Sequence, residues 1–186
     1  VTFPLEDDPS RQLLVWTTTP WTLLSNVAVA VHPELEYGEY RAGERRIVLA
    51  TSRATLLSSS AKGAPSFAQL GAVRRFAGTE LLGLRYQRPL EVVPLPDDKA
   101  SRIVVPGNFV TAEDGSGLVH MAPAFGADDF QAGAEHGLAL VRPVAPDGTF
   151  VGTSWPEIEG RLVTARETND LIIARLKREG RWHLTE

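Results

Sequence analysis

Short apolar segments, repeatedly interrupted by proline and glycine, constrain this sequence more than any other feature. The segments are rich in Val, Leu, Ile and Thr, which is typical of buried strands. Proline and glycine between them mark the places where strands end. The expected strands are residues 12–18, 27–31, 35–40, 46–50, 72–76, 90–93, 103–105 and 118–121, with a hairpin turn at residues 42–44 joining the third and fourth.

Helices are expected in only a few places. Gly137 and Gly180 supply stop signals after two of them, and Thr164 with Glu167 fits a Thr-x-x-Glu capping box at the start of the last one. The ranges with helical patterns are 128–136 and 165–179, and shorter ones at 53–60 and 66–70. Strands and helices that do not alternate strictly predict an α+β fold. We expect a barrel-like, mostly antiparallel β core with peripheral helices, forming a single domain over all 186 residues.

Composition excludes several classes of chemistry. The chain has no cysteine, which rules out a thiol nucleophile, a disulfide scaffold and a Cys-ligated zinc site. No apolar run is long enough to cross a membrane, and we expect a cytoplasmic protein. The net charge of −4 predicts weak binding to nucleic acid by the isolated chain. A first residue of Val1 suggests a fragment of a larger protein.

The first unusual motif is Trp-Thr-Thr-Thr-Pro-Trp-Thr at residues 16–22, followed by Asn26. Threonines that end a strand present hydroxyls on both faces, and Pro20 turns the backbone so that the last hydroxyls can line a pocket. A threonine-rich strand end flanked by core tryptophans would have the same sequence. Catalytic threonine nucleophiles usually use the free amine of an N-terminal threonine, and these threonines are internal.

The second motif runs from Asp114 to Phe130 and contains His120 and the pair Asp128 and Asp129. A half-buried histidine bonded to the backbone and a simple helix cap are the structural explanations. Only one aspartate can occupy the cap position, which leaves the other carboxylate free to face a ligand. The four histidines lack metal-binding spacing, so we expect no metal, and no phosphate loop or dinucleotide fingerprint indicates a cofactor.

Residues 16–22 with Asn26 resemble the threonine-rich motif of the editing domain (CP1) inserted into the class I synthetases for isoleucine, valine and leucine, in its isoleucyl wording. Residues 115–129 resemble the Gly-Thr-Gly-Ile-Val-His…Ala-Pro…Gly-x-Asp-Asp motif of the same domain. The departures are Ser116 in place of Thr, and Leu24 and Ser25 before Asn26 where Pro and a small residue are common. The ATP-site signatures of a synthetase are absent from the sequence, so this chain is not expected to activate an amino acid.

The resemblance implies a role for each matching residue. Asp129 should bind the α-ammonium group of the attached amino acid, a charge-assisted bond of roughly 1.5–3 kcal/mol. His120 should gate the side-chain end of the pocket, admitting valine and excluding isoleucine. The other implied residues are Thr17, Thr18 and Thr19, which line the pocket and position the attacking water, Trp21 and Asn26, which support the pocket wall and the adenosine, and Asp128, which also binds substrate.

The implied activity is deacylation of valine-charged tRNA(Ile) by a positioned water, as part of an isoleucine–tRNA ligase, with valyl-adenylate as a second candidate substrate. One methylene gives only about 1–3 kcal/mol of discrimination, a limit for which isoleucyl-tRNA synthetase is itself the standard example. The implied partners are the tRNA 3′ end and the remainder of the synthetase with its Rossmann catalytic domain. The alternatives are a non-catalytic binding module of the same fold and a valyl-enzyme domain that clears threonine, against which the isoleucyl wording argues.

Overall fold

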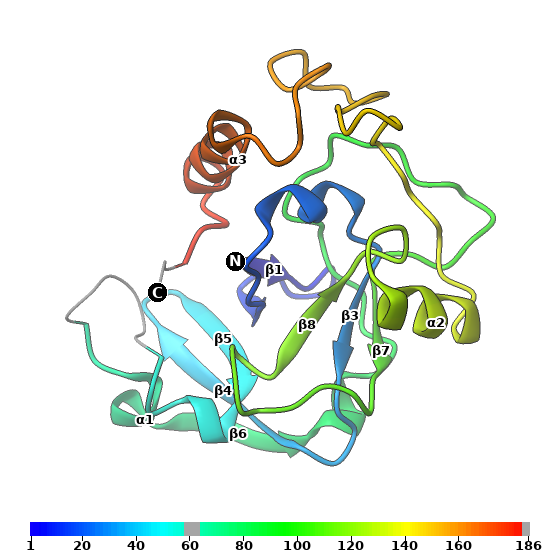
Figure 1. The fold of residues 1–186 in the computed structure, drawn as a ribbon. Coiled ribbons are helices and arrows are strands. Elements are labelled where there is room, and N and C mark those ends of the chain that lie inside the picture. Colours follow the sequence, from blue (N-terminus) through cyan, green and yellow to red (C-terminus); the bar gives the residue numbers. More distant parts are fainter. Residues whose placement is uncertain (58–63, 184–186) are drawn as a thin grey trace.

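The computed structural model describes residues 1–57 and 64–183 and arranges their strands in two sheets (Figure 1). The larger sheet has the order β1 (Thr2–Pro4), β2 (Arg11–Leu14), β5 (Arg45–Ala50), β4 (Glu36–Ala42) and β6 (Ala72–Ala77). The smaller has the order β7 (Ile103–Pro106), β3 (Ala28–Val31) and β8 (Leu118–Met121). Neighbouring strands are antiparallel except β2–β5 and β3–β7, which are parallel.

Helices are few and lie around the sheets. They are the 3-10 helices η1 (Pro20–Ser25), η2 (Thr51–Arg53) and η3 (Gly78–Leu81) and the α-helices α1 (Phe67–Leu70), α2 (Ala127–Glu135) and α3 (Arg166–Arg178). The predicted α+β class with mostly antiparallel strands is confirmed. Within the described part of the chain the barrel-like core consists of two sheets that do not close into a full barrel. Isolated bridges between strand ends, such as Trp16–Val119, connect them instead.

The apolar run at residues 28–31 forms the central strand of the small sheet and is covered on both faces. All four residues of β3 are buried, and β3 pairs with β7 on one side and β8 on the other. A strand buried on both faces needs a continuous apolar run rather than alternation. The hairpin of β4 and β5 and the strand β6 also form close to the expected residues.

Two strand predictions were wrong. The first expected strand ends at Leu14 rather than residue 18, and only Trp16 beyond it makes a bridge. Residues 90–93 are largely buried but form no strand. The carbonyl of Val93 instead accepts a hydrogen bond from the Arg88 guanidinium (2.8 Å), and Pro94 follows directly. The Val93 carbonyl is therefore bonded to Arg88 instead of a neighbouring strand, and Pro94 has no N–H to donate to one.

The helix predictions were right in position and partly wrong in detail. At α1, Ser66 and Gln69 form a capping box. The capping box expected at α3 is absent, because Ala165 occupies the cap position without a side-chain bond, and Asn169 Nδ2 donates to the Ala165 carbonyl (3.0 Å). Of the helix expected at 53–60, Arg53 is the last residue of η2, residues 54–57 form turns and a bend, and residues 58–60 lie outside the described residues. None of the described helices is long and apolar enough to cross a membrane.

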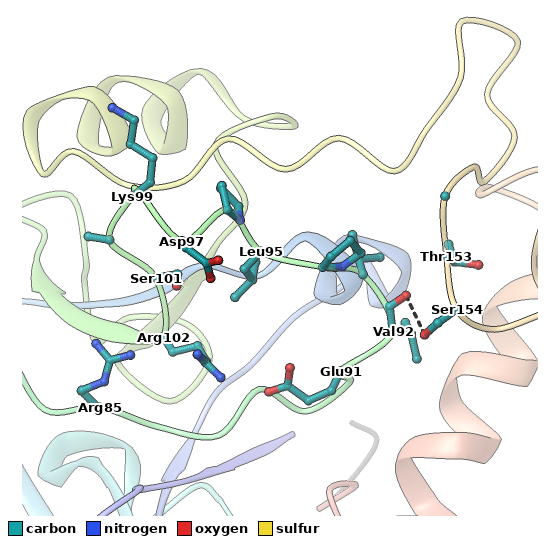
Figure 2. Close-up of a pocket in the computed structure, with 15 residues that line it drawn as sticks. Arg85, Glu91, Val92, Leu95, Asp97, Lys99, Ser101, Arg102, Thr153 and Ser154 are labelled. Carbon is teal, nitrogen blue, oxygen red and sulfur yellow. Dashed lines mark hydrogen bonds between the residues drawn. The ribbon is translucent and has the colours of Figure 1, made fainter.

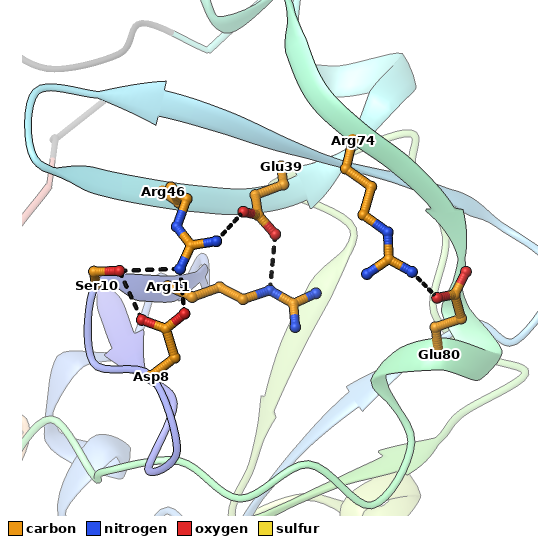
Figure 3. A network of polar contacts seen from close by, with 7 residues as sticks. All are labelled: Asp8, Ser10, Arg11, Glu39, Arg46, Arg74 and Glu80. Carbon is orange, nitrogen blue, oxygen red and sulfur yellow. Dashed lines mark hydrogen bonds and ion pairs between the residues drawn. The ribbon is translucent and has the colours of Figure 1, made fainter.

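A buried carboxylate ties the large sheet together (Figure 3). Arg11 and Arg46 are register partners across the parallel pair β2–β5, so their like charges lie side by side. Glu39, only 4% exposed, neutralises both, with distances of 2.9 Å to Arg11 Nε and 2.9 Å to Arg46 Nη1. Asp8 completes the network through Arg46. A carboxylate so buried is tolerated only when paired in this way.

Candidate active site

One cavity of about 380 Å³ brings the two sequence motifs together. The first motif contributes the segment that leads into η1, and the second contributes the turn before β8, the end of β8 and the start of α2. Among the predicted site residues, those that line this cavity are Thr17, Thr18, Thr19, Trp21, His120 and Asp129. The two segments are about 100 positions apart in the sequence, and the pairing of β8 with β3 places them side by side.

The threonine segment is shaped by bonds between its own side chains and backbone. The amide of Thr19 donates to Thr17 Oγ1 (3.0 Å), and Thr22 Oγ1 donates to the Thr19 carbonyl (2.8 Å). Such local bonds compete with a sheet ladder and explain why the strand stops early. Pro20 then starts η1, where a missing N–H is tolerated. Thr18 remains exposed, with its hydroxyl 3.4 Å from that of Thr19.

The two aspartates at the start of α2 have different environments. The N-cap residue of α2 is Gly126, so the expected cap by one of the two aspartates is wrong. Asp129 is half-buried, and its Oδ2 accepts a hydrogen bond from the Ala122 amide (2.7 Å). Burial raises the pKa of Asp129; the Ala122 bond opposes this rise and the charge of Asp128 adds to it. Asp128 itself is exposed and lines a different cavity, so the structure does not bring it to the site.

His120 has a fixed ring orientation and a fixed charge. Its Nε2 lies 3.0 Å from Thr22 Oγ1, and because that hydroxyl donates to the Thr19 carbonyl, Nε2 is the donor of this pair. Nδ1 is then the unprotonated nitrogen, and it is buried with no hydrogen-bond partner in the described part of the chain. Burial lowers the pKa of His120 to about 4. The ring is therefore neutral at physiological pH and is held rigidly at the cavity wall.

The lowered pKa of His120 predicts a specific loss of stability in acid. An unfolded histidine titrates at about 6.5, whereas His120 in the folded chain titrates at about 4. Between these values the unfolded state binds a proton that the folded state does not, so the free energy of unfolding falls as pH drops. The expected loss is on the order of 3 kcal/mol. In urea titrations from pH 7 to 4, His120→Gln should lose less stability than the parent. His136→Gln, which removes a histidine elsewhere, should follow the parent curve, and equal curves for all three would contradict this account.

Trp21 and Asn26 support the site in different ways. Trp21 packs edge-to-face on Phe125, with ring centroids 4.8 Å apart, so each motif contributes one ring to the wall. Asn26 is completely buried and does not line the cavity. Its Nδ2 donates to the Ala28 carbonyl (2.9 Å), and its Oδ1 accepts from the Tyr86 hydroxyl (2.6 Å). Asn26 can therefore hold the turn from η1 into β3, but the expected contact with an adenosine is not compatible with its burial.

The sequence analysis missed the contributions of Thr22 and of the glycines before β8. Gly117 has φ +77°, and a Cβ there would lie 2.5 Å from the Ala50 Cβ. Tyr37 donates its hydroxyl to the Gly117 carbonyl (2.8 Å) and fixes this close approach. Gly115, with φ +63°, packs against the Trp16 side chain. The glycine pair in the second motif was a visible signal, because glycine is the residue that such conformations favour.

Solved structures define the class of fold. The chain aligns with the structure described as "The crystal structure of GlLeuRS-CP1" at a TM-score of 0.67 and 15% identity, covering 95% of this chain and 85% of that one. It also aligns with the editing domain of the Plasmodium knowlesi cytosolic leucyl-tRNA synthetase, at a TM-score of 0.51 and 15% identity over 90% and 71% of the two chains. The chain therefore has the fold of the CP1 editing domains of class I synthetases.

Sequence relatives show which class I synthetase family the chain belongs to. The chain is 49% identical to the isoleucine–tRNA ligase of Thermobifida fusca over 81% of its length, 40% identical to that of Thermoplasma acidophilum over 96%, and 42% identical to that of Mycobacterium leprae over 94%. No protein-family profile matches the chain. It spans 14–16% of these three ligases. The chain thus belongs with the isoleucine–tRNA ligases and corresponds to their editing-domain segment, as the two motifs predicted.

Proposed function

We propose that this cavity hydrolyses the ester bond of valine-charged tRNA(Ile), and that valyl-adenylate is a second substrate. The observation that carries the proposal is the convergence of the Asp129 carboxylate, the threonines at residues 17–19 and a neutral His120 on a single cavity. The tRNA 3′ end would enter from solvent, and the remainder of a cytoplasmic synthetase would deliver it.

Asp129 would bind the α-ammonium group of the attached valine. Its Oδ2 is held by the Ala122 amide, which fixes the orientation of the carboxylate and would leave Oδ1 to accept from a ligand. An arriving ammonium group would favour the ionised carboxylate and offset the rise in pKa that burial causes. Binding and ionisation are therefore coupled at this residue.

The threonine segment would position the attacking water. The Thr17 hydroxyl already accepts from the Thr19 amide, whereas the hydroxyls of Thr18 and Thr19 lie 3.4 Å from each other, and Thr18 is exposed and lines the cavity. An aminoacyl ester is an activated acyl group, so correct placement of a water molecule can supply much of the rate enhancement. A neutral His120 that donates Nε2–H to Thr22 acts as a wall in this scheme and not as a general base.

Specificity would come from the rigidity of that wall. The Thr22–His120 hydrogen bond joins η1 to β8 and fixes the distance between the motifs. A side chain one methylene larger than valine would have to displace this pair. Discrimination of this kind by a second site supplements the 1–3 kcal/mol that a first apolar pocket can give, the limit for which this enzyme family is the standard example.

Incubation of the chain with valine-charged tRNA(Ile) tests the proposal directly. Valine should be released, and Thr18→Val, which removes the hydroxyl while keeping the shape, should slow the release by up to about tenfold, as expected for one hydrogen bond. Thr79→Val, at an exposed threonine in η3 outside the cavity, is the matched control and should act as the parent. Binding of the charged tRNA without any valine release would show a binding module instead.

A further inference from the structure

A second cavity, of about 870 Å³, lies apart from the candidate active site (Figure 2). The long loop between η3 and β7 forms most of it, and residues 152–154 close one side. None of its lining residues also lines the candidate active site. Its charged residues are Arg85, Lys99, Arg102, Glu91 and Asp97, so cations outnumber carboxylates by one.

Arg102 has a backbone conformation that residues other than glycine seldom adopt. Among the described residues it is the only one other than glycine with a positive φ, at 55°. Its backbone is fixed at both ends, since its amide donates to the Val27 carbonyl (2.6 Å) and its carbonyl accepts from the Tyr86 amide (3.2 Å). Its Nε is buried and has no hydrogen-bond partner within residues 1–57 and 64–183. Strained residues that the surroundings hold in place concentrate at ligand sites.

The positive charge near Arg102 is poorly neutralised within the chain. Arg88 does not line the cavity; it is only 2% exposed and donates to the carbonyls of Val93 and Leu24. Burial lowers the pKa of Arg88, and the charge of Arg102 adds to that effect while the exposed Glu91, 3.9 Å away, opposes it. Arg85 is already engaged with Glu6 (3.2 Å). Arg102 and Lys99 line the cavity with Asp97, and no ion pair involves either cation within the described residues.

We propose that this second cavity binds one phosphodiester group of a nucleic-acid strand, with Arg102 as the main contact and Lys99 as a supporting one. A guanidinium fork matches the oxygens of a phosphate, and one phosphodiester carries the single negative charge that the lining residues call for. This assignment rests on the proposed function in one respect, because the strand would be the tRNA whose 3′ end occupies the active site.

The 3-10 helix η1 connects the two cavities. Trp21 and Thr22 of this helix line the active-site cavity, and its Leu24 carbonyl accepts from Arg88. Arg88 in turn bonds to Val93 in the wall of the second cavity. A strand held at both places would pass over η1. A local phosphate site also explains how a chain of net charge −4 could hold tRNA without a general basic surface.

The test measures uncharged tRNA(Ile) binding to the chain between about 20 and 200 mM salt. Arg102→Asn removes the guanidinium and keeps a residue that tolerates positive φ. We expect Arg102→Asn to weaken binding by about tenfold at low salt and to reduce the slope of log K against log salt by about 0.7–0.9, the value for one phosphate. Arg75→Gln removes the same charge from β6, where Arg75 is 62% exposed and only weakly paired with Glu36 (3.5 Å), and should change neither quantity appreciably. Lys99→Gln should give a smaller loss than Arg102→Asn.

Several outcomes would overturn this proposal. They are equal effects of Arg102→Asn and Arg75→Gln, no salt-dependent tRNA binding by the parent chain, and binding of inorganic phosphate at Arg102 without any effect of the variant on tRNA. Urea unfolding of each variant confirms that the fold persists. Hydrolysis of 3′-O-valyl-adenosine, which has no phosphate, separates the two proposals. Failure of the parent chain on this ester would count against the proposed function, whereas an unchanged rate in Arg102→Asn alongside weakened tRNA binding supports the phosphate site.

Discussion

Replacement of Asp129 by asparagine should reduce valine release from valine-charged tRNA(Ile) by roughly 10- to 100-fold, because a charge-assisted bond contributes roughly 1.5–3 kcal/mol. The same change should not destabilise the fold. The pKa of Asp129 is raised in the folded chain, so ionisation at neutral pH opposes folding, and that opposition grows as pH rises past the unfolded value. Asparagine removes this effect and keeps an oxygen that can accept from the Ala122 amide. Single-turnover deacylation and urea unfolding at pH 7 measure the two effects.

Asp128→Asn is the matched control for this experiment. Asp128 is exposed and lies outside the cavity, so the variant should keep most of its activity. The charge of Asp128 raises the pKa of Asp129, so its removal should move the acid limb of the pH–rate profile to lower pH. A normal rate for Asp129→Asn, or an acid limb that moves upward in Asp128→Asn, would contradict the assignment of the ammonium-binding carboxylate.

Truncation of His120 should let the cavity accept a larger amino acid. In His120→Ala we expect hydrolysis of isoleucine-charged tRNA(Ile) to rise by about 10- to 100-fold, since one methylene of steric exclusion corresponds to about 1–3 kcal/mol, a scale for which isoleucyl-tRNA synthetase is the standard example. Valine release should change much less. The ratio of the two single-turnover rates measures the change, because any general loss of activity cancels in the ratio.

Thr22→Val tests whether discrimination depends on the position of the His120 ring as well as on its presence. The substitution removes the hydroxyl that holds His120 Nε2 and donates to Thr19, while the imidazole itself remains. We expect discrimination against isoleucine to weaken, but less than in His120→Ala. Unchanged discrimination in both variants would show that another part of the cavity excludes isoleucine.

The sequence was sufficient to predict the class of fold and the meeting of the two motifs at one cavity. It was not sufficient to predict the contacts among the residues that line that cavity. β3, the β4–β5 hairpin and α2 follow from local apolar pattern and turn chemistry, which are short-range properties. The neighbours of Thr22 and the role of Asn26 depend on His120 and Tyr86, which are distant in the chain. No local pattern contains that information.

The errors at residues 12–18 and at Thr164 have local causes that composition and motif do not reveal. A run such as residues 12–18 has the composition of a strand, and only the bond from the Thr19 amide to Thr17 shows why the ladder ends. The expected capping box at Thr164 fits a motif, yet the backbone places Ala165 at the helix start. The expected barrel-like core does not close in the described residues, because strand pairing across the two sheets is reduced to isolated bridges.

The meeting of the two motifs through β3 and β8 has a consequence for folding. The hairpin of β4 and β5 joins neighbouring segments, whereas the Thr22–His120 contact joins residues 98 positions apart, just over half the length of the chain. Contacts between distant segments generally form late, since closing a long loop loses more chain entropy. During refolding, recovery of deacylation should therefore lag behind the recovery of β-sheet circular dichroism, and no partly folded form would be able to discharge tRNA.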